Sequence, residues 1–217
     1  MSEAPSVHIC GRNVGRPGHL CAFFDSREQE YDVLAPYYKE GLAAGEEVIT
    51  IVDADRKDDH CKRVAHYEIP VEHAMADGTF KVLTAEDTYT AGGRFEATRM
   101  YELLQSALVD AKRHGRRVRT SGVMDWSNAG TPGTEELMEY EARVNVLVPM
   151  YDCTLLCVYD ISKISATAMM DILQTHPYVV HRRKVLENPY YIAPIDVLKE
   201  QLLDTAGPVA TMPEIQA

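Results

Sequence analysis

Two histidine–cysteine pairs near the start of the chain have the residue types that bind metal ions. His8 and Cys10 form the first His-x-Cys pair, and His19 and Cys21 form the second. Imidazole nitrogen and thiolate sulfur are ligands that suit Zn²⁺. The second pair falls inside a predicted strand, where both side chains would share one face, and cysteine is commonly a small buried apolar residue. A metal or redox sensor built on these four residues is one alternative, and residues buried in an ordinary core are the other.

A second group of chemically capable side chains lies on a predicted helix over residues 133–148. The apolar stripe of this helix places Glu141 at one edge, with Asn145 one turn further along, and Arg143 at the opposite edge. A carboxylate and a guanidinium beside a core need partners because unpaired buried charge is costly. These residues fit two interpretations: the polar floor of a ligand pocket, or an internal salt bridge that fixes the helix to the sheet.

Acidic and aromatic residues follow the predicted strands at the points where the strands end. The carboxyl ends of parallel strands share one edge of the sheet, and ligands bind in the crevice beyond it. Aromatic walls with a few fixed polar groups are typical of a small-molecule pocket. The alternative, favoured for each aspartate taken singly, is that Asp25, Asp53 and Asp160 cap the helices that follow them. The residues at these ends are Phe24, Asp25, Asp53, the loop over 84–94, Met124, Asp125, Trp126, Tyr159 and Asp160.

The sequence lacks a phosphate-binding loop where a nucleotide-binding α/β protein carries one. That loop reads Gly-x-x-x-x-Gly-Lys-Ser/Thr between the first strand and its helix, so that backbone amides and the lysine hold the phosphates. Residues 24–28 here read Phe-Asp-Ser-Arg-Glu. The glycine-rich stretch over 130–134 has no lysine and is expected to begin a helix, with Thr131 as its cap and Pro132 in its first turn. ATP hydrolysis is therefore not expected, and no Ser-His-Asp order indicates another catalytic function.

Short apolar runs alternate with amphipathic runs along the chain, and these elements must position the residues above. Such alternation is typical of βαβ units, in which helices cover both faces of a mostly parallel sheet. The predicted fold class is three-layer α/β. Strands are predicted over residues 19–24, 47–52, 80–83, 117–123 and 154–159, with one or two more within 178–194. Helices are predicted after Ser26 as far as Gly45, from Asp55 to 66, around 100–111, and over 133–148, 165–175 and 195–203.

Composition and length exclude several classes of protein. The 217 residues include 33 acidic and 22 basic side chains, a net charge of −11, which argues against broad binding to nucleic acid or anionic membranes. No apolar stretch approaches the roughly 18–20 residues of a membrane helix, and residues 1–5 lack the features of a secretory signal. Five scattered cysteines do not form a disulfide framework, so a reducing, cytoplasmic setting is expected. Basic clusters over 112–119 and 181–184 are interpreted as solvated faces, with a partner surface as the alternative.

One domain is expected because the chain shows neither an internal repeat nor a boundary between two cores. Residues 1–18 are predicted to be an N-terminal extension and residues 19–204 the domain itself. Residues 205–217 contain two prolines and no periodicity, which predicts a flexible tail.

Many short segments along this domain are together similar to one known family. They read FFDSREQEYDVL (23–34), GLAAGE (41–46), EDTY (86–89), GGRF (92–95), MDW (124–126), EYEARVN (139–145), CVYD (157–160), MDIL (170–173), THP (175–177) and NPYY (188–191). From about His19 to Leu198 the chain resembles the MEDS domain, the methanogen and methylotroph sensory domain. That family looks like a degenerate relative of the RecA and KaiC-type ATPases, so the resemblance implies a RecA/KaiC-like fold without a P-loop.

The resemblance implies a signal-sensing domain, proposed to bind small hydrocarbon derivatives and commonly attached to transcription-factor or histidine-kinase modules. No such module is expected here, because residues 1–18 are too few for a winged helix and the tail is too short for a kinase. We therefore predict a non-catalytic sensing module in signal transduction or transcriptional regulation that acts through a protein partner. A small-molecule ligand is expected, direct binding to a membrane or to nucleic acid is not, a homo-oligomer is left open, and no cofactor is identified.

The ligand pocket is predicted at the carboxyl ends of the strands. Binding there would shift the population of the loop over 84–94, which Gly92 and Gly93 allow to move. A diverged nucleotide-binding protein and a metal or redox sensor built on the two His-x-Cys pairs remain as alternatives. The predicted walls are Phe24, Tyr89, Trp126 and Tyr159, and the predicted polar contacts are Asp25, Arg94, Asp125, Glu141, Arg143, Asn145 and His176.

Overall fold

A seven-stranded sheet forms the centre of the computed structural model, which describes residues 7–14, 18–128 and 130–196. The strand order is β5-β4-β6-β7-β3-β8-β9, and β1 and β2 pair separately as a two-stranded hairpin. All neighbours in the large sheet are parallel except β8 and β9, which are antiparallel. The strands are β1 (His8–Ile9), β2 (Arg12–Asn13), β3 (Gly18–Phe24), β4 (Glu47–Val52), β5 (Phe80–Thr84), β6 (Val118–Val123), β7 (Thr154–Asp160), β8 (Tyr178–His181) and β9 (Lys184–Glu187).

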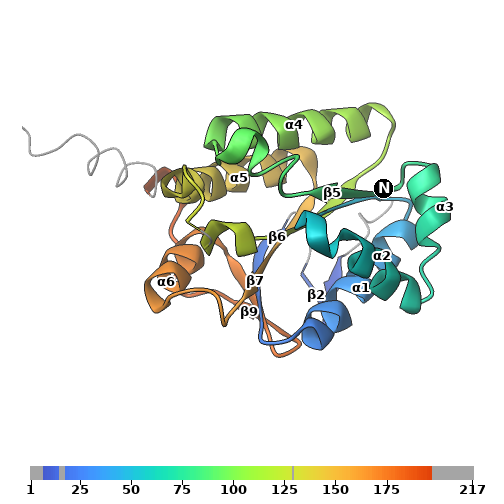
Figure 1. Ribbon diagram of the computed structural model, residues 1–217, viewed down its shortest axis with the longest axis horizontal. Helices are drawn as coiled ribbons and strands as arrows, with labels where there is room; N and C mark the ends of the chain where they lie inside the picture. The colour runs from blue at the N-terminus through green and yellow to red at the C-terminus, as the bar shows by residue number, and fades with distance from the viewer. Residues whose placement is uncertain (1–6, 15–17, 129, 197–217) are drawn as a thin grey trace, which may run out of the picture.

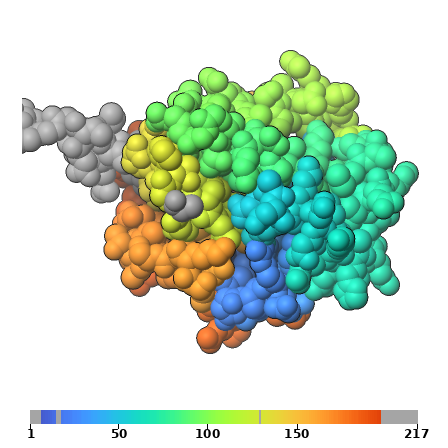
Figure 2. All heavy atoms as spheres, in the orientation of Figure 1, coloured from blue at the N-terminus to red at the C-terminus, as the bar shows by residue number. Residues whose placement is uncertain are grey.

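Helices cover both faces of this sheet (Figure 1). The α4 and α5 helices lie side by side over one face, and α1 and α2 pack on the other. In the space-filling view, the green segment that precedes α4 adjoins the cyan segment at the start of α2 on the face shown (Figure 2). The helices are α1 (Arg27–Ala43), α2 (Lys57–His66), α3 (Val71–Ala76), α4 (Ala97–Arg113), α5 (Leu137–Tyr151) and α6 (Ala166–Thr175).

Burial on both faces explains why the strands read as continuous apolar runs. Every residue of β3 and of β4 is buried, as expected for central parallel strands between two helical layers. Because side chains alternate along a strand, Leu20 and Ala22 join the core beneath α1, whereas Cys21 and Phe23 join the core beneath α4 and α5. The same alternation turns His19 toward α5. The predicted α/β class with a mostly parallel sheet is confirmed.

The first helix begins as its sequence predicts and approaches the sheet closely. The hydroxyl of Ser26 accepts a hydrogen bond from the backbone N–H of Gln29 at 3.4 Å, which caps α1. Further along, a Cβ at Gly41 would lie 2.8 Å from Nε of Arg119 on β6. The buried Arg119 guanidinium donates to Glu46 and Glu40, each at 2.7 Å. Those two carboxylates compensate the buried charge on this side of the sheet.

The predicted helix over 133–148 begins later than expected, at Leu137. Gly133 has φ +89°, and a Cβ there would overlap the carbonyl oxygen of Phe95. The close approach of Phe95 therefore determines the local backbone, and a 3₁₀ turn (Thr134–Glu136) precedes α5. Thr131 does not cap a helix, since its hydroxyl donates to the carbonyl of Trp126 at 2.9 Å.

Two other boundaries differ from the prediction. Asp55 lies within a 3₁₀ turn (Ala54–Arg56) instead of capping α2. The α3 helix was not predicted because six residues are too few to show a helical period. Of the predicted helix over 195–203 only residues 195 and 196 are described, and the predicted tail over 205–217 lies outside the described residues.

Candidate functional site

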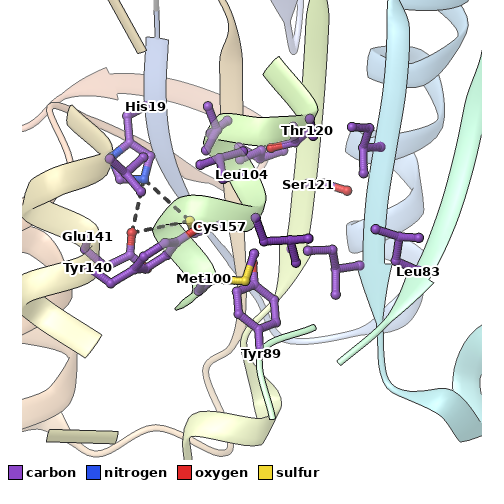
Figure 3. Close-up of a pocket in the computed structure, with 18 of the residues that line it drawn as sticks. His19, Leu83, Tyr89, Met100, Leu104, Thr120, Ser121, Tyr140, Glu141 and Cys157 are labelled. Carbon is purple, nitrogen blue, oxygen red and sulfur yellow. Dashed lines mark hydrogen bonds and ion pairs between the residues drawn. The ribbon is translucent and has the colours of Figure 1, made fainter. Parts of the chain in front are cut away.

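A cavity of about 100 Å³ lies between the sheet and the helices α4 and α5 (Figure 3). Strands β4, β5, β6 and β7 form its floor, and α4 and α5 form its roof. Most of the lining is apolar, so the cavity offers little to a charged or strongly hydrated molecule. The apolar lining residues are Ile49, Ile51, Leu83, Met100, Leu103, Leu104, Ala107, Tyr140, Val144, Leu155 and Leu156, with Tyr89 and Gly122.

Tyr89 forms an aromatic wall of the cavity, and Gly122 on β6 makes room for it. A Cβ at Gly122 would overlap the hydroxyl oxygen of Tyr89. The Tyr89 ring stacks on Trp126 with ring centroids 5.1 Å apart, and Trp126 in turn stacks on Phe95 at 4.9 Å. This stack joins the loop after β5 to the segment after β6, so that the position of Tyr89 depends on both.

Four polar side chains from four separate segments converge at one end of the cavity. His19 comes from β3, Glu141 from α5, Cys157 from β7, and His176 directly follows α6. Nε2 of His19 lies 3.2 Å from Oε2 of Glu141 and 3.5 Å from Sγ of Cys157, as the dashed lines in Figure 3 mark. Oε2 of Glu141 also lies 3.7 Å from that sulfur and 3.6 Å from Nε2 of His176. All four side chains are buried, and all but His176 line the cavity.

Asn145 fixes the orientation of His19. Its amide nitrogen donates to the carbonyl oxygens of Glu141 at 3.1 Å and Thr175 at 2.7 Å. The amide oxygen of Asn145 must then face Nδ1 of His19, which lies 3.2 Å away. An amide oxygen only accepts hydrogen bonds, so Nδ1 of His19 carries a proton and Nε2 is directed at the cluster.

The backbone at the end of α6 fixes His176 in the same way. Nδ1 of His176 lies 2.8 Å from the carbonyl oxygen of Ile172, which can only accept, so Nδ1 is the protonated nitrogen. The hydroxyl of Thr175 donates to that same carbonyl at 3.0 Å. Nε2 of His176 is buried and has no hydrogen-bond partner among the described residues.

Burial controls the protonation of the cluster. It lowers the pKa of His176 to about 3, so this ring is neutral. It also raises the pKa of the Cys157 thiol well above its usual value, so the thiol keeps its proton. Burial alone would raise the pKa of Glu141, but the hydrogen bond with His19 and the adjacent imidazoles lower it below the usual range. A carboxylate therefore faces a neutral imidazole and a neutral thiol.

A separate, polar cleft of about 240 Å³ lies at the carboxyl ends of β3, β6 and β7, where the ligand pocket was predicted. Ion pairs lie along its wall: Arg56 donates to Glu30 at 2.8 Å and lies 3.5 Å from Asp125, to which Lys163 donates at 2.5 Å. Four residues of the predicted site line this cleft and not the apolar cavity: Phe24, Asp25, Asp125 and Tyr159.

The other predicted residues lie around the apolar cavity or at the protein surface, and Trp126 also lines a second strand-end cleft of about 430 Å³ beside the loop over 84–94. Tyr89 and Glu141 line the cavity, while Asn145 and His176 support its polar end and Trp126 stacks behind Tyr89. The structure thus gathers these five predicted residues around one space, although they come from four segments of the chain.

The two predicted arginines lie outside that space. Arg94 lies 3.4 Å from a carboxylate oxygen of Glu136. Arg143 lies 3.3 Å from Glu139 and stacks over the ring of Tyr101, with the guanidinium 4.3 Å from the ring centroid. Of the two interpretations of this helix, Glu141 fits both, because it pairs with His19 and also faces the cavity.

The two His-x-Cys pairs do not come together, so the metal alternative in that form is wrong. His8 binds Glu40 at 2.8 Å, and Cys10 is exposed on the hairpin formed by β1 and β2. Within the described part of the chain, one group of three or more metal-binding side chains is found, and it contains His19 with Glu141, Cys157 and His176. Strand β3 carries His19 into the sheet, away from the hairpin.

The sequence did not predict that Cys157 belongs to the site or that α4 forms a wall of the cavity. Cys157 is directed at the same face as Tyr159 because the two are two positions apart in β7, a signal that was present in the predicted strand. Met100 and Leu104 belong to the predicted helix around 100–111, but periodicity distinguishes buried from exposed positions and not a filled core from a hollow one.

Comparison with known proteins gives a consistent family relationship. Residues 18–177 match the model of the MEDS family, described as the MEthanogen/methylotroph, DcmR Sensory domain. The transcriptional repressor DcmR of Methylorubrum extorquens (strain DSM 6343 / CIP 106787 / DM4) is 24% identical over 179 residues, which cover 81% of this chain and 64% of the repressor. The chain therefore spans less than two thirds of the length of that curated relative.

The fold is similar to that of a solved KaiC-like protein from the hyperthermophilic archaeon Pyrococcus horikoshii OT3. The TM-score is 0.57 at 11% sequence identity, and the alignment covers 77% of this chain and 73% of that one. At this identity the similarity establishes the fold alone. None of the helices in the described residues has the length and apolar character required to cross a bilayer.

Proposed function

Because the chain belongs to the MEDS family of sensory domains, we propose that it senses a small, largely apolar molecule held in the cavity beneath α4 and α5. Its output is regulatory and non-catalytic, and it is passed to a protein partner in signal transduction or transcription. The similarity to a transcriptional repressor supports the regulatory role. The shape and lining of the cavity support the class of ligand.

The observation that carries this proposal is a mostly apolar cavity with a cluster of polar side chains at one end, although Lys81, Thr120 and Ser121 also border it. Its volume of about 100 Å³ is of the same order as the engineered cavity of roughly 150 Å³ in another protein that binds benzene. A ligand of this size has only a few non-hydrogen atoms. Contacts with residues such as Ile51 and Leu104 favour a hydrocarbon skeleton, because burying apolar surface is favourable and burying an unpaired charge is not.

The polar end of the cavity suits a single polar or polarisable substituent. A substituent there would lie against His19, Glu141 and Cys157, which provide a nitrogen, a carboxylate oxygen and a sulfur. Such an arrangement orients an asymmetric ligand, with its hydrocarbon part toward β5 and α4. A small hydrocarbon derivative therefore fits better than either an unsubstituted alkane or an anion.

The aromatic wall provides a route for the signal. Tyr89 belongs to the loop after β5, in which Gly92 and Gly93 have φ values of +77° and +82°. Glycine adopts this backbone without strain, so the loop can change conformation at little cost. A ligand that touches Tyr89 would shift the population of that loop and of α4, which begins at Ala97. A partner protein would then read the altered surface.

Filling the cavity tests the proposal. Ala107→Met on α4 extends a side chain into the cavity, whereas Ser106→Met places the same side chain on the exposed face of that helix. Thermal unfolding would be followed with benzene, 1-propanol and 1-butanol as probes. At ten times the dissociation constant, binding stabilises the folded protein by about 1.4 kcal/mol, or about 3–6 °C. We expect that shift in the wild type and in Ser106→Met, and its loss in Ala107→Met.

Two outcomes would contradict the proposal. One is that none of the three probes raises the unfolding temperature of the wild type, with benzene tested up to its solubility in water and the alcohols tested up to the concentration at which they destabilise the Ala107→Met variant. The other is that Ala107→Met responds to a probe as strongly as Ser106→Met does, which would place the binding site elsewhere.

A further inference from the structure

We infer that His19, Glu141, Cys157 and His176 form a binding site for one divalent transition-metal ion, with Zn²⁺ the best match. The site differs from the one suggested by the two His-x-Cys pairs, of which only His19 takes part. It stands independently of the apolar ligand, because its evidence is the arrangement of four donor atoms and not the cavity beside them.

The spacing of the four donor atoms fits a tetrahedron. Zinc bonds of about 2.0–2.3 Å place neighbouring ligand atoms about 3.3–3.7 Å apart in tetrahedral coordination. Four of the six separations in the cluster are 3.2, 3.5, 3.6 and 3.7 Å. All four donor atoms lie within 4.8 Å of one another. The other two separations are at most 4.8 Å, so small side-chain shifts would place all four donor atoms around one ion.

The hydrogen positions point to a cation at that common point. Both imidazoles carry their proton on Nδ1, where His19 is held by Asn145 and His176 by the carbonyl of Ile172. When the rings are neutral, each Nε2 presents a lone pair toward the carboxylate of Glu141, which also has lone pairs and no proton to donate. Acceptors that face one another at 3.2 and 3.6 Å repel unless a proton or a metal ion lies between them.

A proton on His19 would satisfy one of these contacts but not the other. An imidazolium at His19 could donate from Nε2 to Glu141, yet Nε2 of His176 would still have no donor among the described residues. A metal ion engages both nitrogens and the carboxylate at once. The hydrogen bonds at both Nδ1 atoms are the outer contacts that orient metal-binding histidines.

The charges of the four side chains also balance a divalent ion. One carboxylate and one thiolate neutralise Zn²⁺, and two neutral imidazoles complete the coordination, so the buried site would carry no net charge. Binding forms the Zn–S bond and releases the thiol proton of Cys157 to solvent. No oxidant or reductant takes part.

The four metal-binding side chains are buried and come from different elements, which favours a structural or sensing role for the metal site. The four side chains come from β3, α5, β7 and the segment after α6, so that one ion would join the sheet to two helices. His19, Glu141 and His176 are at most 1% exposed. Because three of the four ligands also line the cavity, a molecule bound there would lie against the ion.

Metal content and cobalt spectroscopy of the full chain test the inference. We expect protein purified without chelator to contain close to one zinc per chain, or chelator-treated protein to bind one equivalent of added Zn²⁺. The Co²⁺ form should show a thiolate-to-cobalt charge-transfer band and the visible absorption of tetrahedral cobalt. Cys157→Ser should lose that charge-transfer band and weaken zinc binding by at least about 100-fold, beyond what the loss of an outer-shell partner costs.

Cys153→Ser is the matched control, since Cys153 is buried directly before the same strand and its sulfur lies 3.9 Å from the carbonyl of Val148. This variant should bind zinc and cobalt as the wild type does. His176→Gln provides a second variant if Cys157→Ser does not fold, and it should keep the charge-transfer band but lose affinity.

Failure of the wild-type protein to retain or bind either metal stoichiometrically would overturn the inference, and so would unchanged binding in Cys157→Ser. Neither result would affect the proposed apolar ligand, which depends on the response of Ala107→Met. Conversely, a protein that binds zinc but none of the apolar probes would retain the metal site and lose the proposed ligand site.

Discussion

At the scale of single residues, Gly122 determines whether the cavity has its aromatic wall. The residue lies on β6, directly beneath Tyr89, and a Cβ there would overlap the Tyr89 hydroxyl oxygen while lying 3.2 Å from the ring carbon Cζ. The clash thus concerns mainly one oxygen atom. Removing that oxygen should make room for the Cβ, which makes the pair suitable for a double-mutant cycle.

Gly122→Ala should lower the free energy of unfolding by about 1–3 kcal/mol, the usual cost of overpacking a core. Tyr89→Phe removes the overlapping oxygen, so the double variant should recover most of that loss. Urea denaturation of the wild type, both single variants and the double variant measures the coupling. If the two single effects simply add, to within about 0.5 kcal/mol, Tyr89 does not contact Gly122 in this way.

At the scale of elements, a buried histidine joins α2 to α1. The hydroxyl of Tyr31 lies 2.8 Å from Nδ1 of His60, and the ring of Tyr38 lies at its side with centroids 5.9 Å apart. Burial between the two helices lowers the pKa of His60 to about 4. The packing of α2 therefore depends on a neutral imidazole.

This packing predicts a pH dependence of stability. The pKa of His60 is depressed in the folded protein and near 6.5 in the unfolded chain. The contribution of neutral His60 to the free energy of unfolding is therefore fully present above about pH 6.5. As the pH falls from 6.5 toward 4, His60 becomes protonated in the unfolded chain before it does so in the folded protein. The free energy of unfolding therefore decreases by up to about 3 kcal/mol.

His60→Gln cannot ionise and should flatten this dependence, which urea denaturation at pH 7 and pH 4.5 would reveal. His66 on the same helix is more exposed, and His66→Gln is the matched control that should preserve the slope. An equally steep loss of stability in His60→Gln would show that another group is responsible.

At the scale of the whole molecule, the fold is KaiC-like while the strand-end cleft is unsuited to phosphate. The junction between β3 and α1 has Asp25 and Ser26 where a glycine-rich loop would be needed. Arg56 in the cleft is already paired with Glu30 and Asp125. The net charge of −11 adds no long-range attraction for an anion.

We therefore predict that MgATP does not bind. Calorimetric titration of the full chain with MgATP should give only the heat of dilution, both at low and at physiological ionic strength. A stoichiometric heat with a micromolar dissociation constant would contradict the prediction and restore the nucleotide-binding alternative.

Composition and periodicity determined the fold class and the identity of most elements. The runs that became β3, β4 and β7 were evident because central parallel strands are buried on both faces and therefore continuously apolar. The start of α5 was misplaced because Gly133 packs against Phe95, which is distant in sequence. A contact of that kind leaves no local pattern.

The sequence alone singled out Glu141, Arg143 and Asn145 as polar residues that need partners, because a polar group beside an apolar stripe is costly unless it is paired. Only the tertiary structure decided what those partners are. Convergence of His19, Glu141, Cys157 and His176 requires β7 to pair with β3, and α5 and α6 to cover that face of the sheet. The apolar cavity likewise arises where α4 and α5 do not fill the space above β4 and β6. Hydrophobic periodicity specifies which side of each element is buried, whereas a cavity or a cluster depends on how the buried sides of several elements fit together.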